Sequence, residues 1–91
     1  MNEEKNLPLE KAFNLALQNP ENNLEVAEDL CKEILKKKPN HFQANFFLGI
    51  LSALNKKFDI AKQLLNKATE IEPDNSDAHN NLGNVLKQIG E

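Results

Sequence analysis

The fold is decided by one stretch of sequence, PNHFQANFFLGILSALNKKFDIAKQLLNKATEIEP, which runs from Pro39 to Pro73. Its apolar residues recur every three or four positions, first over residues 41–54 and again over residues 58–71. That spacing is typical of amphipathic α-helices. The connection at residues 55–57 is so short that the two helices must pack antiparallel. The stretch is therefore predicted to form one helical hairpin.

The distance of 34 residues between Pro39 and Pro73 indicates a repeat. When the chain is aligned with itself at this period, small and apolar residues coincide, namely Ala44 with Ala78, Leu48 with Leu82, Gly49 with Gly83, Ala27 with Ala61, and Leu30 with Leu64. Such residues are needed where two helices approach closely. The period is therefore one of helix packing.

Three further helices are expected outside the hairpin. Two precede it, over residues 8–19 and residues 24–38, with a turn at residues 21–23. One follows it, over residues 75–89, and Gly90 marks its end. We therefore expect five helices and no strand.

These helices define an all-α protein of antiparallel helix pairs. A flexible N-terminal segment is expected over residues 1–7, and the helical array over residues 8–91. The array divides into repeats at about residues 8–41 and 42–75, with an incomplete repeat at residues 76–91.

Cap residues are expected where the hairpin begins. Asn40, with Gln43 three positions later, is predicted to cap the helix over residues 41–54.

All the basic residues are lysines, and eight of them lie in residues 32–67 beside only two acids. Without arginine, bidentate recognition of phosphate is impossible, so we expect no nucleic-acid partner. We interpret Lys36, Lys37 and Lys38 as favourable charges at a helix C-terminus, with anion binding as the alternative.

Several other classes of site are not expected. Cys31 is the only cysteine, which excludes an internal disulfide and a cysteine-based metal cluster. His41 and His79 have no partners at ligand spacing, and the isolated glycines form no phosphate-binding loop. No run of about 18 apolar residues suggests a membrane span, and the polar N-terminus does not suggest a signal peptide. We therefore expect a cytoplasmic protein without metal, cofactor or catalytic activity.

The order of residues in the repeat resembles the tetratricopeptide signature, in which tryptophan, leucine-glycine, tyrosine, alanine, a large apolar residue and proline follow at fixed spacings. The matching residues are Leu48, Gly49, Ala61, Leu65 and Pro73 in the second repeat, and Leu82 and Gly83 in the third. The aromatic anchors are replaced, by Asn45 and Ser52 in the second repeat and by His79 and Leu86 in the third. Nearby phenylalanines are expected to supply the lost bulk.

This resemblance implies a right-handed solenoid of stacked helix pairs. The first helix of each pair would line a concave groove that binds a peptide or another protein. Members of the family are also found as N-terminal parts of larger proteins, including enzymes such as glycosyltransferases and sulfotransferases. The leading expectation is therefore a non-enzymatic interaction module, and the alternative is a structural or oligomerising N-terminal arm of a larger protein.

The groove is expected on the face of each first helix that does not carry the leucine-glycine pair. The predicted groove residues are Ala12, Ala16, Phe46, Ile50, Asn80, Asn81 and Asn84. Phe46 and Ile50 would form an apolar pocket, or would instead pack between repeats in place of the missing anchors. The three asparagines would hydrogen-bond a peptide backbone, or would be solvated helix surface.

The last helix carries apolar residues that the incomplete third repeat is expected to leave uncovered. These residues are Val85, Leu86 and Ile89. Two such ends would bury each other across a twofold axis. A homodimer through residues 75–89 is the corresponding prediction.

Overall fold

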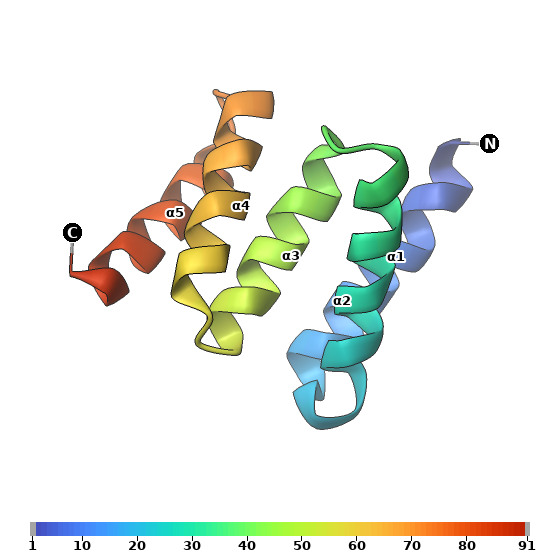
Figure 1. Ribbon diagram of the computed structural model, residues 1–91. Coiled ribbons are helices and arrows are strands. Elements are labelled where there is room, and N and C mark those ends of the chain that lie inside the picture. Colours follow the sequence, from blue (N-terminus) through green and yellow to red (C-terminus); the bar gives the residue numbers. More distant parts are fainter. Residues whose placement is uncertain (1, 91) are drawn as a thin grey trace.

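The computed structural model describes the backbone of residues 2–90 and the side chains of residues 8–90. Five helices follow one another, namely α1 (Asn2–Gln18), α2 (Pro20–Lys37), α3 (Phe42–Leu54), α4 (Phe58–Ile71) and α5 (Ser76–Ile89). In Figure 1, α1 lies partly behind α2 and α5 partly behind α4, with α1 and α5 at opposite sides of the molecule and each in contact with α3. No strand occurs between residues 2 and 90, so the predicted all-α fold of five helices is confirmed.

The first two helices begin earlier than the sequence predicts. α1 starts at Asn2 rather than Pro8, which lies inside the helix although a proline cannot donate the usual backbone hydrogen bond. The glutamates, lysine and leucine before it are good helix formers, which favours the longer helix. The flexible N-terminal segment expected over residues 1–7 stays a prediction, and residue 1 and the side chains of residues 2–7 lie outside the described part of the chain.

α2 begins at Pro20, so residues 21–23 belong to the helix and the predicted turn there is wrong. Proline suits the first helical position because no partner is needed for an N–H group that it lacks. The connection between α1 and α2 is reduced to Asn19, which forces the two helices close together.

The helices that begin each later pair are capped by side chains. Nδ1 of His41 accepts a hydrogen bond from the backbone N–H of Ala44 at 3.1 Å, and Oδ1 of Asn75 accepts one from the N–H of Ala78 at 3.0 Å. The predicted cap at Asn40 is therefore wrong by one residue. Histidine can occupy this position only while its Nδ1 carries a lone pair.

Two clusters of buried side chains hold the helices together. The first joins α1, α2 and α3 around Leu9, Cys31 and Leu51, all wholly buried. The second joins α4 and α5 through Ala61, Leu65 and Val85, and it also contacts α3. Phe46 of α3 packs against both clusters. The side-chain packing is therefore continuous from the first helix pair to α5.

Close approach of α3 and α4 depends on Gly49. A Cβ atom at this position would lie 2.8 Å from Cγ of Leu65, a distance that atoms in proteins do not tolerate. A Cβ atom at Gly83, one period later, would meet nothing within 4 Å. The glycine at this repeat position therefore lies in a close helix contact in α3, whereas the corresponding glycine in α5 borders open space.

A hollow between α3 and α5

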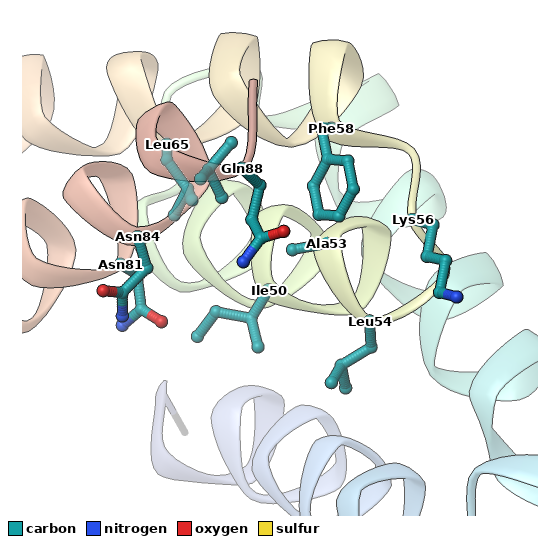
Figure 2. A pocket seen from close by; sticks show the side chains of 10 residues that line it. Ile50, Ala53, Leu54, Lys56, Phe58, Leu65, Asn81, Asn84 and Gln88 are labelled. Carbon is teal, nitrogen blue, oxygen red and sulfur yellow. The ribbon is translucent and has the colours of Figure 1, made fainter. Parts of the chain in front are cut away.

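A hollow of about 380 Å³ opens between α3 and α5, and α4 contributes to its lining. This size is at the lower end of the range for sites that hold small ligands or short peptide segments. Its lining comes from α3, from the α3–α4 turn, from α4 and from α5, and consists of Ile50, Ala53, Leu54, Lys56, Phe58, Leu65, Asn81, Asn84, Val85 and Gln88 (Figure 2).

The floor of the hollow is apolar. Leu65 is wholly buried there and Val85 is 4% exposed, since both belong to the second core cluster. Ile50 is half-buried beside them, and Leu54 is 52% exposed at the rim. An apolar side chain entering the hollow would therefore leave water and contact several carbon-rich groups.

One wall of the hollow is formed by amide side chains of α5. Asn81, Asn84 and Gln88 are spaced three and four residues apart, so they share one face of the helix. Nδ2 of Asn81 donates to the backbone oxygen of Asp77 at 2.8 Å. Among the described residues the side chains of Asn84 and Gln88 have no hydrogen-bond partner, and both remain exposed. This wall offers donors and acceptors to a ligand.

The charge of the hollow comes from one residue. Of the ten lining residues, Lys56 is the single charged one, and no carboxylate is among them. Lys56 is exposed, and Figure 2 shows it at the end of the hollow opposite Asn81 and Asn84. The hollow therefore combines an apolar floor, an amide wall and a cationic end.

Three of the predicted groove residues meet in this hollow, namely Ile50, Asn81 and Asn84. Asn80 is exposed but points elsewhere on α5, outside the lining. Asn81 and Asn84 therefore border an apolar floor, as peptide binding would require, whereas Asn80 is exposed helix surface.

The other predicted groove residues take part in packing. Ala16 is wholly buried in the first cluster, so its assignment to an accessible groove is wrong. Ala12 is half-buried against the same cluster. Phe46 packs between the two clusters, as the alternative for this residue held. The cause is the close stacking of the first helices, in which the rings of Phe13 and Phe47 lie parallel with centroids 4.1 Å apart.

Several lining residues were not predicted. Leu54 and Gln88 are one 34-residue period apart on the first helices, so including this pair in the predicted groove would have identified both. Phe58 and Leu65 come from α4, whereas the predicted groove lies on the first helices only, and they reach the hollow because Gly49 lets α4 approach α3. Lys56 lies in the turn, outside any helical row.

The residues predicted for self-association are partly used inside the chain. Val85 is buried against Ala61 and Leu65, so it cannot contribute to a surface between copies. Ile89 is half-buried and packs on the same cluster, and Leu86 is half-buried. Val85 and Ile89 face α4 because they lie four residues apart on one side of α5. Self-association itself stays a prediction, now resting on Leu86 and Ile89.

The remaining candidate groups show no reactive arrangement. Burial raises the pKa of the Cys31 thiol to about 12, and the negative charge of Glu28 adds to this effect. The thiol is thus a packing group. Within the described part of the chain, no three side chains of His, Cys, Asp or Glu gather where they could hold a metal ion. No helix among the described residues has the length and apolar character needed to cross a bilayer.

Comparison with known proteins finds chains of similar sequence. The family model described as "Tetratricopeptide repeat" matches residues 21–85. Tetratricopeptide repeat protein 37 of Xenopus laevis is 34% identical over 61 residues, and Superkiller complex protein 3 of Homo sapiens is 35% identical over 58 residues. These alignments cover 67% and 64% of the chain but only 4% of each relative. The chain thus corresponds to a small part of their length.

A solved structure is similar over nearly the whole chain. The C-terminal TPR-containing domain of an FK506-binding protein from Plasmodium falciparum superimposes with a TM-score of 0.74 at 26% sequence identity. The match covers 97% of this chain and 59% of that one.

Proposed function

The chain belongs to the tetratricopeptide repeat family, and from this premise we propose that it binds an extended segment of a partner protein in the hollow between α3 and α5. The fold is generally a protein–protein interaction module and is typical of non-enzymatic scaffolds. The use of this particular hollow is the proposal.

The observation that most supports it is an apolar floor beside two amide side chains, those of Asn84 and Gln88, which have no hydrogen-bond partner among the described residues. An extended peptide brings backbone N–H and C=O groups that need partners when water is displaced. Asn84 offers both a donor and an acceptor, and its side chain has no partner among the described residues. Ile50, Leu65 and Val85 would at the same time receive an apolar side chain of the peptide.

Heteronuclear NMR titration tests the proposal. The probe is a pool of short, end-blocked synthetic peptides, each with one central leucine, isoleucine or phenylalanine and variable neutral flanks. We expect shift changes at Ile50 and Asn84 and smaller ones on the convex surfaces of α2 and α4. Asn84→Ala should weaken binding, and Asn80→Ala is the matched control because Asn80 is an exposed amide on the same helix outside the hollow.

The proposal is wrong if no peptide of the pool shifts the hollow resonances. It is also wrong if the shifts gather on the convex side, or if Asn80→Ala weakens binding as much as Asn84→Ala.

A second candidate function is an oligomerising unit that pairs through α5. The observation that favours it is the open space at Gly83, where a Cβ atom would meet nothing within 4 Å, whereas Leu65 of α4 occupies the corresponding space at Gly49. Leu86 lies one turn further along α5 and is half-buried. Sedimentation equilibrium distinguishes this function from peptide binding, since only an oligomer changes its mass with concentration.

A further inference from the structure

We propose that the hollow selects peptide segments in which an acidic residue lies next to an apolar one, and that Lys56 recognises the acid. This inference deepens the proposed function and rests on it. It names the chemistry of the partner segment and a residue that determines specificity.

The first observation is the backbone of Lys56. Among the described residues, Lys56 is the only one other than glycine with a positive φ, at 61°. Its N–H donates to the oxygen of Ala53 at 3.0 Å, and the N–H of Lys57 donates to the oxygen of Ser52 at 2.8 Å. This pair of bonds is the Schellman arrangement that ends many helices, and its left-handed residue is usually glycine.

The next repeat has glycine at the same position. Gly90 lies 34 residues after Lys56 and has a φ of 93°. Both positions thus have a positive φ, one with glycine, which favours it, and one with a lysine. A residue whose backbone is kept in an unfavourable conformation is frequently found at a ligand site. The turn itself favours glycine over lysine at this position.

The second observation is the place of the Lys56 side chain. Figure 2 shows Ile50 and Leu54 between Asn81 and Asn84 on one side and Lys56 on the other, so a peptide crossing the hollow would pass from these amides over carbon to the ammonium group. Lys56 forms no ion pair with any described residue. An ammonium group only donates hydrogen bonds, and a carboxylate is its strongest partner.

The surrounding charge favours the same ligand. Lys56 and Lys57 lie together in the α3–α4 turn, and no acid lines the hollow. An acidic residue would therefore be attracted to this end of the hollow. A basic segment would be repelled.

Fluorescence anisotropy with three labelled synthetic peptides tests the inference. Each has one central leucine, flanked on both sides by aspartate, by serine or by lysine. We expect the aspartate peptide to bind about threefold to tenfold more tightly than the serine peptide, and the lysine peptide to bind most weakly. The advantage of the aspartate peptide should shrink as salt is added.

Two variants locate the effect. Lys56→Gly should make the aspartate and serine peptides bind equally well, and the turn should stay folded because glycine suits it. Lys57→Ala is the matched control, because it removes the same charge from the next residue, which does not line the hollow. Circular dichroism would check that both variants are folded.

The outcomes separate this inference from the proposed function. If the serine peptide binds but Lys56→Gly keeps the aspartate preference, or Lys57→Ala loses it equally, the inference is wrong and peptide binding stands. If none of the three peptides binds, both are wrong.

Discussion

The side chain of Asn45 donates a hydrogen bond from Nδ2 to the carbonyl oxygen of Pro39, over 3.0 Å. One period later, Nε2 of His79 lies 2.7 Å from the carbonyl oxygen of Pro73. Asn45 and His79 occupy the position of the tryptophan in the family signature. In both repeats a polar side chain thus ties the beginning of a helix to the loop before it, where an aromatic anchor would have packed.

Asn45→Ala should lower the free energy of unfolding by about 1–3 kcal/mol, because it removes the partner of two backbone oxygens. The side chain is 3% exposed and also donates to the oxygen of His41 at 2.9 Å. Urea denaturation gives the value, with Asn66→Ala in the exposed part of α4 as the control. Equal stability of the two variants would mean that the tie contributes nothing.

The two helix-interior glycines should respond oppositely to the same substitution. Gly83→Ala should raise the free energy of unfolding by up to about 1 kcal/mol, because alanine favours a helix and the new methyl group meets no atom. Gly49→Ala should lower it, since Cγ of Leu65 is only 2.8 Å away, and Gly49→Leu should lower it by about 2–3 kcal/mol. Thermal and urea midpoints measure both. A stabilised Gly49→Ala would contradict the close contact of α3 with α4.

The cap at His41 should make stability depend on pH. Burial lowers the pKa of the His41 imidazole, and the charge of Lys38 lowers it further. The unfolded state therefore binds the proton more readily, and stability present above about pH 6.5 is lost as the pH falls towards the folded-state pKa. His41→Asn keeps a capping oxygen at every pH, so its stability should change less between about pH 7 and pH 5. Parallel slopes for the two proteins in urea titrations would exclude this role.

Lys56→Gly should be more stable than the wild type by up to about 1 kcal/mol, because an L-residue in the left-handed conformation costs about this amount relative to glycine. The midpoint of thermal unfolding measures the change. The same variant is expected to lose selection for acidic peptides, so stability and specificity should move in opposite directions. A destabilised variant would show that the lysine side chain supports the turn.

Self-association through α5 should make the apparent mass increase with concentration. Leu86→Glu should keep the protein monomeric in sedimentation equilibrium without a large loss of stability, because Leu86 lies outside the two core clusters. Ile89→Lys should also weaken association, but it should lower stability because Ile89 packs on the second cluster. A wild type that stays monomeric at the highest soluble concentration would contradict the prediction.

The helices and their stacking could be predicted because the period of 34 residues is a property of side-chain size along the chain. Ala44 and Ala78, which the period pairs, are both wholly buried. The beginning of α2 could not be predicted, because Pro20 suits both a loop and the first position of a helix. Only the packing of α1 on α2 selects the helix.

The site was predictable only in part for a related reason. A row of residues on successive helices follows from the sequence, but its exposure depends on the distance between those helices. Phe13 and Phe47 lie one period apart on the first helices, and their rings meet face to face in the cluster that buries Ala16. At the other end α5 carries no phenylalanine to stack against α3, so Ile50 and Asn84 border an open hollow.

Phe46 has a consequence for how the molecule comes apart. Arrays of repeats unfold one unit at a time when the interfaces between units are weak. Here a single aromatic ring packs on the cluster of the first pair and on the cluster of the last helices. Unfolding of either end would remove contacts of this ring and so destabilise the other end. We therefore expect the two halves to be thermodynamically coupled and the chain to unfold in a single transition.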